Sequence, residues 1–235
     1  MGRIFETRKH RMFARWAKNA KAFTKVGKEI AIAIKLGGPD PAGNPRLRMA
    51  VQTARSLNMP KDRVDAAIQR AAGKDESTLL EMQYAGYAPH GIALFISTAT
   101  DNPTRTVANV RSILTSYGGS LASSGSLDFL FRHLVSFRLK TPAGSIDDLE
   151  LELIDHGLEE LERDEEELQI LCKFSEFGTM QRTLEERKLE ITSAGSVWIP
   201  NSTIELNEAQ EKSVHEVIEA LEEDDDVQHI FHNIA

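Results

Sequence analysis

The chain has 235 residues, a formal net charge of −8 and a hydrophobic content of 41%. These values are typical of a soluble globular protein with one large domain or two to three smaller ones. The longest apolar runs, such as residues 92–95, fall far short of the roughly 20 residues that cross a bilayer, so we expect no membrane span.

The single cysteine, Cys172, excludes an intramolecular disulfide. It lies in an alternating apolar stretch, which predicts a small core residue rather than a catalytic thiol. Both features are typical of a reducing compartment, so we expect a cytoplasmic protein. The first residues lack the apolar segment of a secretory signal. A mitochondrial transit peptide is the alternative for this Arg-rich start, although Glu6 and the scarcity of serine argue against it.

The charge is divided unevenly along the chain. Residues 1–74 hold 17 Lys or Arg and 5 acidic residues, a net charge of +12, whereas residues 75–235 carry −20. The overall acidity therefore conceals a strongly basic N-terminal segment, residues 1–74, called the basic front below. This distribution, unlike the total charge, predicts a polyanionic partner such as nucleic acid.

The predicted first helix carries a cationic stripe. At 100° per residue, seven basic residues fall within about half of the helical wheel, while Phe13, Ala17, Ala20 and Phe23 fall mostly elsewhere. Such a stripe suits contacts with backbone phosphates. The alternatives are a solvated face or one that pairs with the acidic part of the same chain; a membrane surface is less favoured because the apolar side is small. The stripe consists of Arg8, Arg11, Arg15, Lys18, Lys21, Lys25 and Lys28.

The basic front predicts three helices, at 8–36, 45–57 and 60–72, separated by the breaker sequences GGPDPAGNP and NMPKD. Farther along, alternation and apolar runs predict strands at 82–89, 91–99, 126–131, 133–140, 158–163, 167–174, 190–199 and 226–232. Helical spacing predicts helices at 101–119, 146–156, 176–189 and 207–222.

This order predicts an α+β fold with three domains. The domains are a basic three-helix domain (1–77), a middle α/β domain (78–132 and 206–235) and an α/β domain inserted into it (133–205). The inserted stretch follows the β-α-β-β-α-β order of a ferredoxin-like module, and the remainder from residue 91 onward is predicted to follow the same order. The C-terminal helix is then expected to pack on the sheet that begins at residue 82.

Motifs for catalysis are lacking. We find no phosphate loop, no dinucleotide glycine pattern and no nucleophile elbow. His229 and His232 would face opposite sides of a strand, which disfavours a shared metal. The acidic runs at 162–167 and 222–226 lack the spacing of a calcium loop and are expected to be solvated. We therefore expect no enzyme, no metal and no cofactor.

One polar group could hold an anion. Asp101, Asn102, Arg105 and Thr106 gather at the start of the helix predicted at 101–119, where free backbone N–H groups are available. Ordinary helix capping is the favoured alternative for these residues.

Several stretches resemble the YebC/PmpR-like regulatory protein family, whose relatives include the mitochondrial translational activator of cytochrome c oxidase subunit I. The most specific are GGPDPAGNPRLRMAVQTARSLNMPKDRVDAAIQRA, YAGYAPHGIAL and TDNPTRTVANVRSIL. The resemblance covers nearly the whole chain. One departure is the start, where most members have a Gly-His-Ser-Lys-Trp signature and this chain has MGRIFETRKHRMFARW.

The resemblance implies three domains, one inserted in another, and no catalytic site. It implies a basic surface made by the stripe together with Arg46, Arg48 and Lys61, and loop positions of interest at Asn58, Met59 and Pro60. It implies a DNA-binding transcriptional regulator. The alternative is a translation factor on the ribosome, contacting ribosomal RNA or tRNA, that eases synthesis of proline-rich stretches.

Charge does not separate these two roles, because both partners are polyphosphates. The chain has no clear helix-turn-helix, and its third helix offers only Arg63, Gln69 and Arg70 as candidates for contacts with bases. We therefore favour a binding mode that recognises the backbone or the shape of the nucleic acid over one that recognises its bases.

Overall fold

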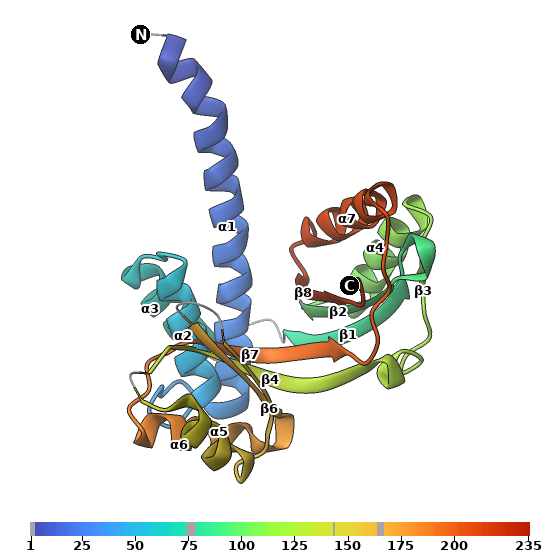
Figure 1. Ribbon diagram of the computed structural model, residues 1–235. Helices are drawn as coiled ribbons and strands as arrows, with labels where there is room; N and C mark the ends of the chain where they lie inside the picture. Colours follow the sequence, from blue (N-terminus) through green and yellow to red (C-terminus); the bar gives the residue numbers. More distant parts are fainter. Residues whose placement is uncertain (1–2, 74–78, 143, 164–166) are drawn as a thin grey trace. The chain divides into compact units, whose positions relative to one another are not determined.

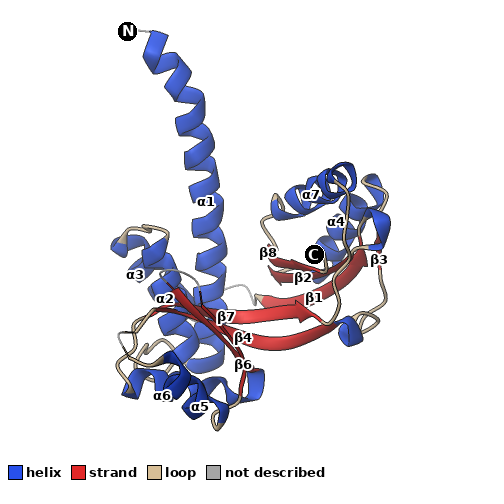
Figure 2. Ribbon diagram, viewed as in Figure 1, coloured by secondary structure: helices blue, strands red, loops and turns tan. Residues whose placement is uncertain are grey.

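The computed structural model describes residues 3–73, 79–142, 144–163 and 167–235, with side chains from residue 20 onward. Its elements are an N-terminal helical region and two four-stranded sheets, which confirms the predicted α+β class (Figures 1 and 2). The chain divides into two compact units. The first comprises Met1–Met82, Thr98–Thr106 and Glu222–Gln228, and the second comprises Gln83–Ser97, Val107–Leu221 and His229–Ala235. The predicted boundaries of three domains stay a prediction.

The first unit contains helices α1 (Arg3–Gly37), α2 (Pro45–Ser56) and α3 (Lys61–Ala72), close to the predicted limits. Their apolar faces form one core, because residues at helical spacing on each helix turn toward the others. Its buried members are Val26, Ile30, Ala33, Ile34, Leu47, Ala50, Ala54 and Val64.

Two loop asparagines set the ends of these helices. Buried Asn44 caps α2 by accepting a hydrogen bond from the Leu47 N–H, and its amide donates to the carbonyls of Ala33 and Gly38 near the end of α1. Asn58 ends α2 in the left-handed region, at φ 57°, which asparagine tolerates better than most residues. Met59 then packs on the helical core. The NMPKD loop is therefore a tight connection between α2 and α3.

The first sheet has the strand order β3-β1-β2-β8. Its strands are β1 (Leu80–Tyr87), β2 (Ala93–Thr100), β3 (Ser120–Leu121) and β8 (Val227–His232). Helices α4 (Pro103–Ser116) and α7 (Glu208–Glu222) lie on one face of this sheet (Figure 1). Strand β8 thus returns next to β2, and α7 packs on the sheet as predicted.

The second sheet has the order β5-β6-β4-β7 and antiparallel pairing throughout. Its strands are β4 (Phe131–Lys140), β5 (Leu158–Arg163), β6 (Glu167–Lys173) and β7 (Ile191–Pro200), with helices α5 (Ile146–Ile154) and α6 (Phe177–Glu186) against one face. This is the ferredoxin-like arrangement expected for the inserted stretch. Buried Phe137 and Ile170 lie in the core between sheet and helices.

One predicted strand is wrong. Residues 126–131 contain a 3-10 turn, Asp128–Leu130, that follows a turn at Gly125 with φ +77°. Leu127 and Phe131 are buried but Phe129 between them is 72% exposed, so the apolar residues do not share one face of a strand. The first sheet is completed instead by β1, which precedes residue 91 and lies between β3 and β2. The predicted β-α-β-β-α-β order from residue 91 onward is therefore wrong, because only three strands of this sheet follow that residue.

Candidate functional site: basic helix α1, the acidic turn and the Asp226 cluster

Three lysines of the predicted stripe point at the turn between α7 and β8. This turn, Glu222–Asp226, has five consecutive acidic residues and is called the acidic turn below. Lys21 Nζ lies 3.9 Å from Glu223 Oε1 and 3.4 Å from the Glu223 carbonyl. Lys25 Nζ lies 3.4 Å from the Glu222 carbonyl. In this part of the stripe, the chain's own acidic segment is the partner.

Lys28 makes the innermost contact. Its ammonium donates to Asp226 Oδ1 at 2.7 Å, to the Asp225 carbonyl at 2.8 Å and to the Ala99 carbonyl at 2.9 Å. An ammonium has three N–H donors, so each has an acceptor. The Lys28 side chain is 18% exposed and that of Asp226 is 7% exposed. Lys28 is therefore a desolvated, fully hydrogen-bonded cation.

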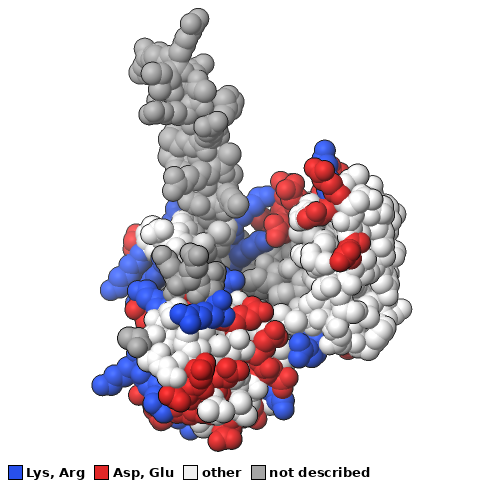
Figure 3. Space-filling view, viewed as in Figure 1, with Lys and Arg blue, Asp and Glu red and all other residues white. Residues whose placement is uncertain are grey.

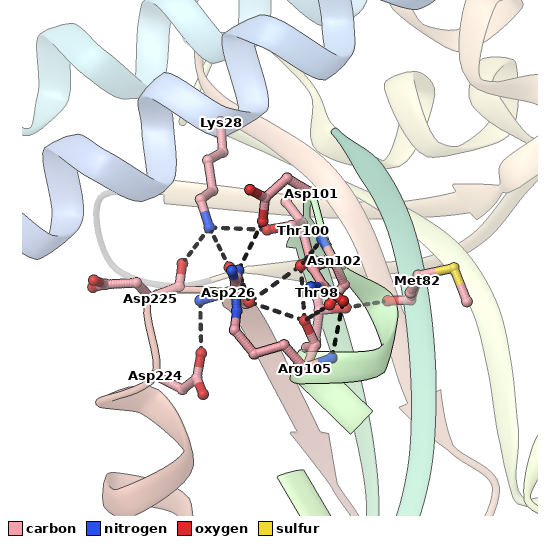
Figure 4. Close-up of polar contacts among 12 residues, drawn as sticks. Lys28, Met82, Thr98, Thr100, Asp101, Asn102, Arg105, Asp224, Asp225 and Asp226 are labelled. Atoms are coloured by element: carbon pink, nitrogen blue, oxygen red, sulfur yellow. Dashed lines mark hydrogen bonds and ion pairs between the residues drawn. The ribbon is translucent and has the colours of Figure 1, made fainter. Parts of the chain in front are cut away.

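The other oxygen of Asp226 collects contacts from β2 and α4 (Figure 4). Its Oδ2 lies 2.9 Å from Arg105 Nη2, 2.9 Å from Thr106 Oγ1 and 3.2 Å from Thr100 Oγ1. The two threonine hydroxyls are 2.8 Å apart. We call Lys28, Thr100, Arg105, Thr106 and Asp226 the Asp226 cluster. It joins the first helix, the end of β2, the start of α4 and the start of β8.

Local sequence explains why α4 begins at the cluster. Asn102 caps the helix: its side-chain oxygen accepts from the Arg105 N–H at 3.1 Å, and its carbonyl accepts from the Thr106 N–H. Pro103 has a fixed φ that suits the first turn. Asp101 lies one helical turn before Arg105 and pairs with it at 2.8 Å. The TDNPTRT segment thus caps a helix and presents Arg105 and Thr106 to Asp226.

These contacts control the pKa of Asp226. Burial by itself would raise the pKa of this carboxyl, but hydrogen bonds from Lys28, Arg105 and Thr106 outweigh it and lower the pKa to about 2. Hydrogen bonds to Asp226 and Asp101 raise the pKa of Arg105. Burial lowers the pKa of Lys25, against the opposing effect of Glu222. The Asp226 carboxyl is therefore ionised at neutral pH.

Other predicted basic residues lie elsewhere in the first unit. Arg46 bridges two carboxylates, with Nε 2.8 Å from Glu29 and Nη2 3.0 Å from Glu81. Burial alone would lower the pKa of Arg46, but these two glutamates raise it. Arg48 donates to the carbonyls of Pro41 and Ala42 and closes the loop before α2. Arg46 is thus bound within the chain, and Arg48 anchors a loop.

A second set of basic residues is open to solvent. Arg55, Lys61 and Arg70 on α2 and α3 are exposed, and none of them pairs with a carboxylate of the described residues. Arg63, also exposed, places its guanidinium 6.0 Å from the centre of the Phe23 ring. Basic side chains gather around α3, whereas acidic ones gather over α5 and α6 (Figure 3). We call Arg55, Lys61, Arg63 and Arg70 the open basic set.

The structure thus brings together two predicted groups. Lys28, from the stripe, meets Arg105 and Thr106, from the predicted anion site, through Asp226. The side chains of Arg8, Arg11, Arg15 and Lys18 lie outside those described. Asp226 and Thr100 were missed, because one carboxylate in an acidic run looks like its neighbours until the fold buries it. The nucleic-acid and anion roles of these residues stay predictions.

Within the described ranges, no set of three or more His, Cys, Asp or Glu side chains is arranged to hold a metal ion. Nor does that part of the chain contain a helix with the length and apolar character needed to traverse a membrane. Burial raises the pKa of the Cys172 thiol to about 12, as expected for a core residue rather than a nucleophile.

Comparisons with known proteins cover almost the whole chain. The TACO1/YebC protein N-terminal domain matches residues 3–74, and the TACO1/YebC second and third domain matches residues 79–234. A probable transcriptional regulatory protein of Anaeromyxobacter dehalogenans is 53% identical over 240 residues and covers 100% of both chains. One from Parabacteroides distasonis is 53% identical over 235 residues, covering 100% of this chain and 97% of its own.

A solved structure is also similar. The crystal structure of a conserved hypothetical protein from Aquifex aeolicus superposes with a TM-score of 0.80 at 35% sequence identity. The superposition covers 93% of this chain and 91% of that chain.

Proposed function

Since the chain belongs to the TACO1/YebC family, as its sequence resemblance predicted, we propose that it is a non-catalytic, nucleic-acid-binding regulator of gene expression. The first candidate is a DNA-binding transcriptional regulator in the cytoplasm. Its relatives from Anaeromyxobacter and Parabacteroides are named probable transcriptional regulatory proteins, which supports this role.

The observation that carries the proposal is the open basic set. Arg55, Lys61 and Arg70 are solvent-exposed cations without a carboxylate partner among the described residues, on a segment whose net charge is positive. Each Lys or Arg that neutralises a backbone phosphate releases condensed counterions, and this release drives binding. The set can therefore contact phosphates without first breaking an ion pair in the protein.

The arrangement on α3 favours contact with backbone over bases. Asp62 and Asp65 lie among the exposed residues Lys61, Arg63 and Arg70. A carboxylate close to the major groove is repelled by the flanking phosphates, so α3 is poorly suited to lie deep in the groove. Recognition of backbone and shape suits either duplex DNA or structured RNA. For this reason we keep a ribosome-associated translation factor as the second candidate.

Binding to labelled duplex DNA and to a structured ribosomal RNA fragment tests the proposal. Fluorescence anisotropy of the full chain over a range of KCl concentrations gives the dissociation constant and its salt dependence. We expect the triple variant R55E/K61E/R70E to weaken binding by at least about 100-fold and to flatten the salt dependence. The matched control, R138E/R182E/K212E, makes the same charge change at exposed sites of the second unit.

An equal loss in both triple variants would contradict the proposal, since total charge rather than the open basic set would then control binding. A deletion strain separates the two candidates. Longer ribosome pauses at proline runs, with unchanged promoter activity, would favour the translation role. Promoter-specific transcript changes with normal proline-run occupancy would favour the transcription role.

A further inference from the structure

The contacts between α1 and the acidic turn fall into an inner and an outer zone. The inner zone is Lys28 with Asp226, whose facing atoms are 2.7 Å apart and whose side chains are largely buried. In the outer zone, Lys21 lies 3.9 Å from the Glu223 carboxylate and 3.4 Å from its carbonyl, and Lys25 lies 3.4 Å from the Glu222 backbone carbonyl. In the Lys21–Glu223 pair, the side chains are 43% and 79% exposed.

The two zones should respond differently to a competing anion. Exposed ion pairs contribute little, because water and salt screen them and both side chains lose rotamer freedom. Removal of one partner from a buried pair leaves an uncompensated charge and is strongly unfavourable. A phosphate backbone can therefore replace the Glu223 carboxylate at Lys21 and the Glu222 carbonyl at Lys25, but not the Asp226 carboxylate at Lys28.

We infer that the acidic turn is an internal competitor of nucleic acid: Glu223, through its carboxylate, and Glu222, through its backbone carbonyl, occupy Lys21 and Lys25, and a phosphate backbone displaces them. This inference rests on the proposed function and adds a regulation to it. The inner pair, Lys28 and Asp226, keeps the turn attached to α1 after the outer contacts have exchanged.

The turn has a second effect through its charge. Five consecutive acidic residues lie beside Lys21, Lys25 and Lys28 of α1 and repel a polyanion over about 8–10 Å at physiological salt. The ligand must supply enough phosphates to overcome both the ion pairs and this repulsion. The acidic turn therefore favours ligands of high charge density, such as duplexes, over isolated single strands.

The test compares two double variants of the full chain. E222Q/E223Q removes the two outer carboxylates and keeps the backbone carbonyls, whereas E216Q/E219Q removes the same charge from exposed positions of α7. We expect E222Q/E223Q to bind labelled duplex DNA or structured RNA about tenfold more tightly at 150 mM KCl and with a steeper salt dependence. The control should change the affinity by less than about threefold.

A second measurement needs no nucleic acid. Lysine acylation of the free protein, followed by mass spectrometry, should proceed faster at Lys21 and Lys25 in E222Q/E223Q than in the parent or the control, and remain slow at Lys28. Acylation rates at Lys21 and Lys25 that are the same in E222Q/E223Q and in the parent would show that the acidic turn does not mask these lysines.

The binding outcomes separate the inference from the function on which it rests. Salt-dependent binding by the parent chain, with equal affinities in both double variants, refutes the competitor alone. If neither the parent nor either double variant binds nucleic acid, the proposed function fails and the competitor fails with it.

Discussion

The ammonium of Lys28 lies 2.7 Å from the carboxylate of Asp226, although the two residues are 198 positions apart in the chain. This pair joins α1 to the acidic turn. The same carboxylate accepts from Arg105 and Thr106 at the start of α4. Asp226 is therefore the point at which four segments of the first unit meet.

Replacement of Asp226 by Asn should lower the free energy of unfolding at pH 7 by about 3 kcal/mol. The change leaves the Lys28 ammonium and one Arg105 contact without a carboxylate in a site that is largely removed from water. Urea denaturation followed by circular dichroism measures the effect. The control is D225N, because Asp225 contacts Lys28 through its backbone carbonyl and its side chain is exposed. A loss as large in D225N as in D226N would contradict the account.

The contribution of Asp226 to the free energy of unfolding should depend on pH. Its pKa is lowered from 3.8 to about 2 in the folded chain, so ionised Asp226 stabilises the fold above pH 4. That stabilisation is lost as the pH falls from about 4 to about 2, because the carboxyl is then protonated in both states. The difference in unfolding free energy between parent and D226N should shrink by about 2 kcal/mol over this range. A difference that stays constant down to pH 2 would show that the Asp226 cluster does not hold the carboxylate ionised.

Substitutions of two lysines of the stripe should have opposite effects on stability and on the salt dependence of binding. K28M should cost about 2–4 kcal/mol of stability, because it strands Asp226 and two backbone carbonyls. K28M should leave the slope of log K against log salt unchanged when binding is measured at a temperature where the variant is folded. K21M should cost less than about 0.5 kcal/mol but should reduce the salt slope by about one. Salt titrations of the two variants by anisotropy check this, and a reduced slope in K28M would contradict it.

Cys172 should resist thiol reagents in the folded chain. It is fully buried, and burial raises its pKa to about 12, so almost no thiolate exists at pH 8. Reaction with an aromatic disulfide reagent should be at least about 100-fold slower than in urea. A rate close to that of the unfolded chain would show that the core of the second sheet opens readily.

The turn after α4 should not tolerate a side chain. A Cβ at Gly119 would clash with the Tyr87 carbonyl oxygen and lie 3.2 Å from that of Leu114. G119A should therefore lower the melting temperature by about 5 °C or more, since backbone must move. The matched control is G178A in α6, where a Cβ meets nothing within 4 Å and helix propensity improves. Equal melting temperatures for G119A and the parent would contradict the close approach.

Local sequence patterns predicted most of the fold. Strand β5 was predicted at its observed limits, and the three helices of the first unit begin or end within a few residues of prediction, because breakers such as Gly37-Gly38-Pro39 act locally. The error at 126–131 arose because Leu127 and Phe131 imitate alternation while the chain turns at Gly125. Two-residue β3 is too short to leave a pattern.

The site was harder to predict, because it depends on long-range contacts. Helical spacing could show that Lys21, Lys25 and Lys28 share a face, but not that the acidic turn lies against that face. Asp226 could not be distinguished from Asp224 or Asp225 by sequence, although it alone is buried. For these three lysines, the predicted alternative applies: they contact the acidic part of the same chain. The cations of the open basic set lie instead on α2 and α3.

We propose that exposed cations of the N-terminal helices bind a nucleic-acid backbone. The most direct measurement is the affinity of the full chain for duplex DNA and for structured RNA between about 50 and 400 mM KCl. We expect log K to fall linearly with log salt, with a slope of about −3 or steeper that becomes shallower in R55E/K61E/R70E. An affinity that does not change with salt, or a slope unaltered in that variant, would contradict it.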